Sequence, residues 1–112
     1  MVTAIWNSLE DKQTALADLE SYQQIPELRV QFDTDSIPDL PESLEVLYCP
    51  FIELIQLPDL PASLEYLDCS SNKLPHLPDL PASLKNLNCH GNKLTHLPNL
   101  PNLIELLCDN NL

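Results

Sequence analysis

The sequence is poor in glycine and in basic side chains. Its 112 residues contain a single glycine and five lysines and arginines, against 17 aspartates and glutamates. One glycine excludes the glycine-rich loops that cradle phosphate groups. The net charge of −12 repels the phosphates of nucleic acids and of anionic lipids. We therefore expect a protein partner that presents a basic patch, and no nucleic acid.

Long apolar runs are absent from the amino-terminal region as well. Charged side chains interrupt the first 20 residues, so this region predicts neither an export signal nor a membrane span. Catalytic patterns are equally scarce, because no motif joins serine, histidine and aspartate. These absences predict a protein that is not an enzyme and that needs no cofactor.

The main positive feature is an internal repeat with a period of 20 residues. Two adjacent segments, residues 57–76 and 77–96, are close copies of one another, and looser copies flank them. Such a period predicts a solenoid, in which each repeat packs against its neighbours. The predicted division is an amino-terminal capping segment in residues 1–36 and four repeats, the last incomplete, in residues 37–112.

Each repeat combines a short strand with an extended return segment. Residues 66–69 alternate outward and inward side chains, which is the period of a strand, and strands that recur in one direction pair in parallel. Prolines three residues apart, such as Pro58 and Pro61, exclude a helix on the return path. The predicted fold class is α/β, a right-handed superhelix of short parallel strands with a polyproline-like convex side.

Asparagines follow the strands of the later repeats. Asn72, Asn92 and Asn111 lie at the bend, where a side-chain amide can bond the backbone of adjacent turns. Ile52 stands at this position in the first repeat. We therefore expect an asparagine ladder that is interrupted at the first repeat.

The spacing, the prolines and the asparagines together resemble a known repeat. The pattern Leu64-x-x-Leu67-x-Cys69-x-x-Asn72, followed by Leu-Pro-x-Leu-Pro, is similar to the leucine-rich repeat in its 20-residue bacterial form. The resemblance covers residues 37–112, and this form is typical of the type III secreted effectors of the YopM and IpaH groups. It implies a protein-binding domain in a cytoplasm, either that of the bacterium or, after secretion, that of the host cell.

The amino-terminal segment is predicted to form a helical cap. Residues 3–22 contain no glycine or proline and place apolar side chains at mostly three- and four-residue steps, which predicts an amphipathic helix with Thr3 as its amino cap. These side chains are Ile5, Trp6, Leu9, Leu16, Leu19 and Tyr22. Pro26 ends the helix, and residues 28–32 alternate as a strand that pairs with the first repeat. In the effectors that the sequence resembles, a helical element also caps the repeats.

The carboxy-terminal repeat is one residue shorter than the others. The sequence ends at Leu112, directly after Asn111, and shows no polar closing element. This predicts an open apolar end. Such an end belongs either to a shortened chain or to a chain that associates end to end through residues 110–112.

Three columns of like side chains recur at the repeat spacing. Four cysteines lie 20, 20 and 19 residues apart, and we interpret them as reduced, buried thiols because the repeat sets their spacing. These are Cys49, Cys69, Cys89 and Cys108. His76 recurs as His96, and Asp39 recurs as Asp59 and Asp79. We assign them no metal, although a metal ion on the histidines or on the aspartates stays open as an alternative.

The outward side chains of the strands form the concave face of the solenoid, and we place the partner-binding site there. Tyr48 and Tyr66 are its expected anchors, because aromatic side chains combine a large contact area with a polar tip. Acidic neighbours suit a partner that presents lysine or arginine. The predicted partner-binding residues are Val46, Tyr48, Phe51, Glu65, Tyr66, Asp68, Asn86, Asn88, His90, Glu105, Leu107 and Asp109.

The predicted function is that of a non-catalytic protein-protein interaction module, and two alternatives stay open. The chain could be the substrate-recognition part of an effector ubiquitin ligase that lacks its catalytic domain. The IpaH group carries its nucleophilic cysteine in a separate helical domain, and this sequence has no such domain. The chain could also be a structural or oligomerising repeat fragment that stacks on a second copy through its open end.

Overall fold

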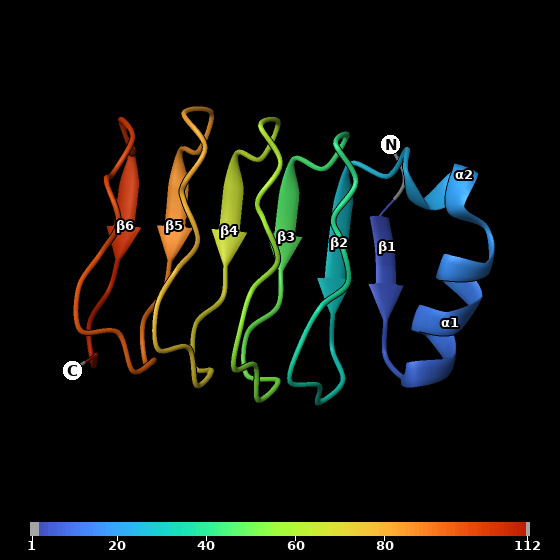
Figure 1. Cartoon of the computed structure of the whole chain (residues 1–112), viewed down its shortest axis with the longest axis horizontal. Helices are drawn as coiled ribbons and strands as arrows, with labels where there is room; N and C mark the ends of the chain where they lie inside the picture. The colour runs from blue at the N-terminus through green and yellow to red at the C-terminus, as the bar shows by residue number, and fades with distance from the viewer. Residues whose placement is uncertain (1–2, 112) are drawn as a thin grey trace.

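The computed structural model describes residues 3–111, which form one open row of parallel strands (Figure 1). The six strands are β1 (Thr3–Trp6), β2 (Glu27–Val30), β3 (Val46–Tyr48), β4 (Tyr66–Asp68), β5 (Asn86–Asn88) and β6 (Glu105–Leu107). They pair in chain order, and the molecule measures 38 × 26 × 18 Å. The structure is therefore a solenoid, and its sheet begins two strands before the predicted repeats.

The register of the sheet places equivalent residues of successive repeats opposite one another. Leu47 pairs with Leu67 and Leu67 with Leu87, and Leu28 of β2 belongs to the same column. These four leucines are at most 1% exposed, and burying each contributes about 1.5–3 kcal/mol. The predicted strands and their parallel pairing are confirmed.

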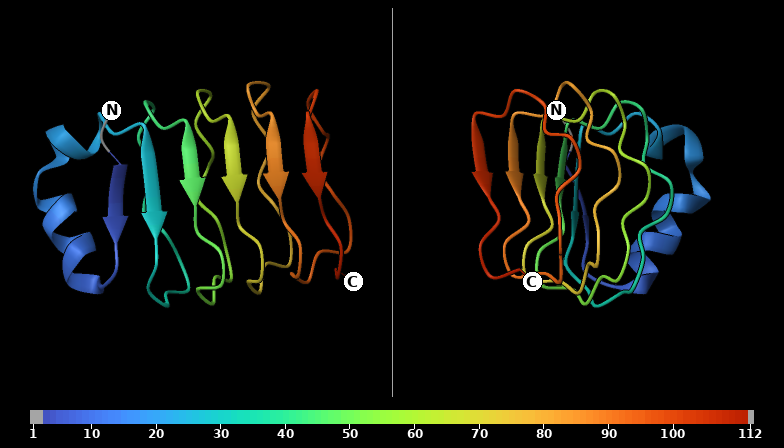
Figure 2. Two further views of the ribbon diagram at one scale, coloured as in Figure 1. Left: turned by 180° about the vertical axis from the view of Figure 1, so that it is seen from behind. Right: turned by 60° about the vertical axis from the view of Figure 1, so that its left-hand side comes forward.

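The return segments form a second layer behind the strands (Figure 2). They contain neither helix nor strand in residues 49–65, 69–85 and 89–104. Leu54 and Leu74 lie on this path and are fully buried, so the core receives side chains from both layers. The extended convex side predicted from the proline spacing is confirmed.

The asparagine ladder joins each turn to the turn before it. The Asn72 side chain accepts hydrogen bonds at 3.0 Å from the backbone N–H groups of Ile52 and Leu54, and it donates at 3.0 Å to the carbonyls of Cys49 and Cys69. Asn72 is only 7% exposed, so water cannot reach these backbone groups to take the place of its hydrogen bonds. One side chain therefore satisfies the backbone of two adjacent turns.

The same arrangement recurs in the later turns. Asn92 accepts from the N–H of Leu74 at 3.0 Å, and Asn111 accepts from the N–H of Leu94 at 3.0 Å. Both amides also donate to the carbonyl of Cys89, each at 3.1 Å. The predicted ladder is confirmed at all three asparagines.

Ile52 interrupts the ladder in the first repeat, as expected. Its side chain is 3% exposed and packs in the core instead of bonding the preceding turn. Its backbone carbonyl accepts a hydrogen bond from the N–H of Thr34 at 2.8 Å, and the carbonyl of Asp35 accepts from the N–H of Ile55 at 3.1 Å. Backbone hydrogen bonds thus replace the side-chain amide where the solenoid meets its amino-terminal segment.

The amino-terminal segment differs from the predicted helix over residues 3–22. Residues 3–6 form strand β1, which pairs along its full length with β2, and the two helices that follow are α1 (Leu9–Ala17) and α2 (Leu19–Tyr22). Thr3 is therefore not a helix cap. Ser8 caps α1 by accepting from the N–H of Asp11 at 3.2 Å. The prediction was wrong because the spacing of apolar residues also suits a strand, and pairing with β2 satisfies that backbone.

The predicted apolar stripe of this segment is only partly buried. Trp6 of β1 and Tyr22 of α2 are 2% and 6% exposed, and their rings stack with centroids 5.8 Å apart. Helix α1 contains no buried residue, and Leu9 and Leu19 are each 55% exposed. The helices lie at the β1 end of the sheet, on the side of the return segments (Figure 2). The Trp6–Tyr22 stack is buried in the core, and Ala15 and Leu16 of α1 pack against the core while partly exposed.

Strand β2 was predicted at residues 28–32 and lies at residues 27–30, where it pairs with β3 as expected. The amino-terminal edge of the sheet is therefore β1 and not β2.

None of the helices in residues 3–111 is long and apolar enough to cross a membrane.

Asn72→Ala is expected to lower the free energy of unfolding by roughly 3 kcal/mol or more. The substitution leaves the N–H groups of Ile52 and Leu54 and the carbonyl of Cys49 unpaired, whereas the carbonyl of Cys69 still accepts from Asn92. Each buried unpaired group costs about 1–3 kcal/mol. Urea denaturation followed by circular dichroism measures the loss. Asn99→Ala is the matched control because Asn99 is exposed, and equal losses in the two variants would contradict the ladder.

Candidate functional site

The strand face is the surface formed by the outward side chains of β1 to β6. Strand pairing aligns these side chains in two columns that run the length of the sheet. From β2 onwards one column holds Glu27, Val46, Tyr66, Asn86 and Glu105, and the other holds Arg29, Tyr48, Asp68, Asn88 and Leu107. Most of the predicted partner-binding residues therefore lie on one continuous surface.

An arginine and two tyrosines form the amino-terminal half of the strand face. The guanidinium carbon of Arg29 lies 5.1 Å from the ring centroid of Tyr48, a cation-π distance, and Arg29 Nε donates to Glu27 Oε2 at 2.7 Å. This hydrogen bond raises the pKa of Arg29. Partial burial raises the pKa of the Tyr66 hydroxyl, and the nearby Asp68 carboxylate adds to the effect. At neutral pH the Arg29 cation therefore lies in the same cluster as a protonated Tyr66 hydroxyl.

Sequence reasoning missed Glu27 and Arg29. The alternation Glu-Leu-Arg-Val predicts their outward direction, but the columns were counted only from the first repeat, at Val46. Ile5 was missed as well, because β1 was interpreted as a helix; it is 48% exposed and pairs with Arg29 across the sheet. The strand face thus extends over two more strands than predicted.

Some polar side chains of the strand face are engaged in the bend that follows each strand. Asp68 is 6% exposed, and its Oδ1 accepts from the backbone N–H of Ser70 at 3.0 Å and from the Ser70 hydroxyl at 2.6 Å. Asn88 Oδ1 accepts from the N–H of His90 at 3.2 Å in the next repeat. These two side chains shape the bend, which leaves the tyrosines as the larger free contact surfaces.

Phe51 lies in the bend after β3 and is 78% exposed. Its φ of 59° is left-handed, and the same position is occupied by Ser71 (φ 55°), Gly91 (φ 70°) and Asn110 (φ 57°) in the following repeats. Glycine and asparagine adopt this conformation readily, whereas an aromatic residue is strained there. An exposed aromatic ring therefore stands at a position that backbone geometry disfavours.

The carboxy-terminal part of the strand face is more open. Glu105 and Asp109 are exposed, and Leu107 is 44% exposed. Leu106 is half-buried, because β6 is the edge of the described sheet. Leu112, part of the predicted open end, lies outside the described residues.

The cysteine column is buried for three of its four members. Cys49, Cys69 and Cys89 are fully buried, and Cys108 is half-buried; all four are free thiols. Burial raises the pKa of Cys69 well above its usual value and that of Cys89 to about 11. The buried members are therefore protonated thiols at neutral pH, which are poor nucleophiles and poor metal ligands.

The histidine and aspartate columns are exposed. His76 and His96 lie on the surface of the return side, as do Asp59 and Asp79. Within residues 3–111 no three histidine, cysteine, aspartate or glutamate side chains come together closely enough to hold a metal ion.

Comparison with known proteins finds similarity among solved structures. No protein-family model matches the sequence, and no curated protein matches it. Among solved structures, YopM from Yersinia enterocolitica WA-314 is 40% identical with a TM-score of 0.70 over 77% of this chain. The match spans only 20% of the YopM chain, so it concerns a set of repeats and not the whole of that protein.

Cys108 is expected to react with Ellman's reagent before the other three thiols. Cys49, Cys69 and Cys89 are closed to solvent and protonated, so they react only when the protein opens. The absorbance of the released thiolate measures a fast and a slow phase. Cys108→Ser should remove the fast phase alone, and fast reaction of a second thiol would contradict the buried column.

Phe51→Asn is expected to raise the free energy of unfolding by about 1 kcal/mol. Asparagine tolerates the left-handed backbone, so the strain at φ 59° is relieved with little loss of packing from a ring that is 78% exposed. Urea denaturation measures the change. Phe51→Ala serves as the control because alanine lacks the polar side chain that lets asparagine tolerate this conformation, so an equal gain in both variants would contradict the strain.

Proposed function

Because the chain is a leucine-rich-repeat protein of the 20-residue type, we propose that it is a non-catalytic module that binds a protein partner on the strand face. The leucine-rich-repeat fold supports a protein-interaction role in general terms. The choice of face rests on the chemistry of its outward side chains. The two helices lie away from this face, on the return side (Figure 2).

The cluster of Tyr48, Tyr66 and Arg29 carries this proposal. Tyrosine and arginine are the side chains that most often dominate the energy of protein interfaces. Here the 5.1 Å stacking of Arg29 on Tyr48 restricts both side chains before a partner arrives. A surface arranged in advance loses less conformational entropy on binding.

The charge of the surface suggests the chemistry of the partner. Glu27 already bonds Arg29, so the cation of the strand face is compensated within the protein. Glu65 is 47% exposed and lies 3.2 Å from Lys85, whereas Glu105 and Asp109 are exposed near the β6 edge. A partner with a basic patch fits this rim, and the net charge of −12 would steer it there.

The proposed contact surface is the full set predicted from the sequence, with Arg29 added. It consists of Arg29, Val46, Tyr48, Phe51, Glu65, Tyr66, Asp68, Asn86, Asn88, His90, Glu105, Leu107 and Asp109. Within it, Asp68 and Asn88 act mainly by holding the bends, because their carbonyl or carboxylate oxygens accept backbone hydrogen bonds. We also propose that residues 1–36 cap the repeats of residues 37–112 through the Trp6–Tyr22 stack.

The resemblance to type III secreted effectors supports a further part of the proposal. The protein would act as a bacterial effector, in the cytoplasm of its own cell or of a host cell after secretion. The similarity to a fifth of YopM does not carry over that protein's partners.

End-to-end association is a second candidate function, favoured by apolar exposure near β6. Ile104 is 78% exposed and Leu107 is 44% exposed at this edge of the described sheet. A second copy that covers them would also pair the free edge of β6. Light scattering over a range of concentrations tests this candidate, and a strict monomer excludes it.

The double substitution Tyr48→Ala with Tyr66→Ala is expected to abolish partner binding and to change thermal unfolding little. The two rings are the aromatic side chains of the outward columns, and they point away from the core. Pull-down with the intact chain and with the double variant, followed by titration calorimetry of the captured partner, measures the loss.

The control is Asp59→Ala with Asp79→Ala, two exposed side chains of the return side. This variant should bind as the unchanged protein does. Binding that survives the tyrosine substitutions, or that depends on the aspartates, would place the partner elsewhere.

A further inference from the structure

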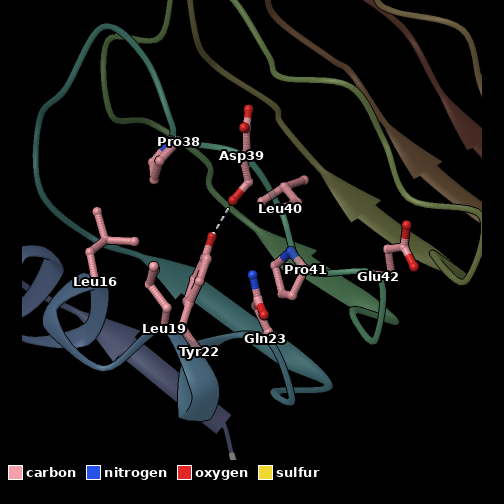
Figure 3. Close-up of a pocket in the computed structure, with 9 residues that line it drawn as sticks. All are labelled: Leu16, Leu19, Tyr22, Gln23, Pro38, Asp39, Leu40, Pro41 and Glu42. Carbon is pink, nitrogen blue, oxygen red and sulfur yellow. Dashed lines mark hydrogen bonds between the residues drawn. The ribbon is translucent and has the colours of Figure 1, made fainter.

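A groove lies on the return side of the molecule, between the amino-terminal helices and the first repeat (Figure 3). Its volume is about 670 Å³, within the range of about 300–1,000 Å³ that is usual for binding pockets. Helices α1 and α2 form one wall, and the proline-rich segment of residues 38–42 forms the other. The groove does not include any residue of the strand face.

Tyr22 holds the two walls at a fixed separation. Its hydroxyl donates to the backbone carbonyl of Asp39 at 2.7 Å (Figure 3). Its ring also stacks on the ring of Trp6. Burial, aided by the charge of Asp39, raises the pKa of Tyr22 to about 12, so the hydroxyl remains a donor at neutral pH. Because this hydroxyl is already bonded, the groove is formed before any ligand arrives.

The walls of the groove are apolar and its rim is acidic. Leu16 and Leu19 face it from the helices, and Leu40 faces it from the other wall, between two prolines (Figure 3). Leu19 is 55% exposed, so more than half of a large apolar residue is open to solvent at this wall. Asp39 and Glu42 are exposed and also line the groove, whereas no lysine or arginine does.

The groove gives Asp39 surroundings that its repeat equivalents lack. Asp59 and Asp79 stand at the same position in the next two repeats, where another extended return segment, and not a helix, lies alongside. Of these three aspartates, only Asp39 therefore lies beside an apolar wall formed by the helices. This combination suits a ligand that carries an apolar group next to a cation. The carboxylates of the groove repel phosphate groups, including those of lipid headgroups.

We propose that this groove binds a short segment of a partner protein that carries an aliphatic side chain next to a lysine or arginine. The aliphatic side chain packs between Leu19 and Leu40. The adjacent cation pairs with Asp39 and Glu42 at the rim. This site is separate from the strand face, so it offers a second contact surface whether or not the strand face binds a partner.

Nuclear magnetic resonance titration of the intact, nitrogen-15-labelled protein tests the proposal. The probe is a six-residue peptide of sequence SLKLRS, blocked at both ends, and the comparison peptides are SLELES and SGKGRS. The basic apolar peptide is expected to shift the backbone amides of Leu16, Leu19, Gln23 and Leu40. The comparison peptides lack either the cations or the leucines, so they should shift these amides little at equal concentration.

Two pairs of matched variants separate the apolar and the acidic contributions. Leu19→Ser is expected to weaken binding by about tenfold, because a serine removes most of the apolar wall, whereas Leu9→Ser should not, although Leu9 is equally exposed at 55%. Asp39→Asn should weaken binding at low salt by about threefold, and Asp59→Asn should leave it unchanged.

The proposal is overturned if the peptide shifts amides of the strand face instead, if SLELES binds as well as SLKLRS, or if no amide shifts at millimolar peptide. The variant Tyr48→Ala with Tyr66→Ala keeps the two hypotheses apart, because it should leave peptide binding in the groove intact. Loss of groove binding in that variant would also contradict the proposal.

Discussion

The constraint on which this structure depends is the pairing of backbone groups between turns that contain no helix. In an extended return segment few N–H groups bond a carbonyl of their own turn, as Leu64 does with Pro61, so most partners must come from neighbouring turns. Parallel strand pairing provides hydrogen-bond partners for the backbone of the strand in each turn. At the bend after the strand, Asn72 and Asn92 bond carbonyls and N–H groups of two turns at once.

This constraint explains why the repeat is strict in some columns and variable in others. Each asparagine must keep its position relative to the strand before it and to the groups it bonds, and Asn111 does so although its repeat is one residue shorter. The side chains of the outward columns neither bond the backbone of adjacent turns in this way nor fill the core. Residues as different as Tyr66, Asn86 and Glu105 therefore occupy one position. The chemistry that distinguishes this solenoid from others with the same core therefore lies in its outward columns and its bends.

The repeats could be predicted from the sequence because every level of the pattern agrees there. Leucine spacing, proline spacing and asparagine position each point to the same turn. The segment of residues 3–22 offered no such agreement, since Ile5, Trp6 and Leu9 suit a strand as well as a helix, and pairing with β2 decided the outcome. The groove could not be predicted from the sequence, because Leu19 and Leu40 line the same groove only through the placement of α2 beside the first return segment.

The two proposed surfaces face different directions, and this limits how partners can use them. The strands form one side of the coil, while α2 and the first return segment lie on the opposite side (Figure 2). One flat partner surface cannot cover both. A partner that uses both must reach around the β1 edge with an extended segment, and linking two weak contacts in this way raises the overall affinity well above either one. Otherwise the strand face and the groove are free to bind two different chains at the same time, because the groove includes no residue of the strand face.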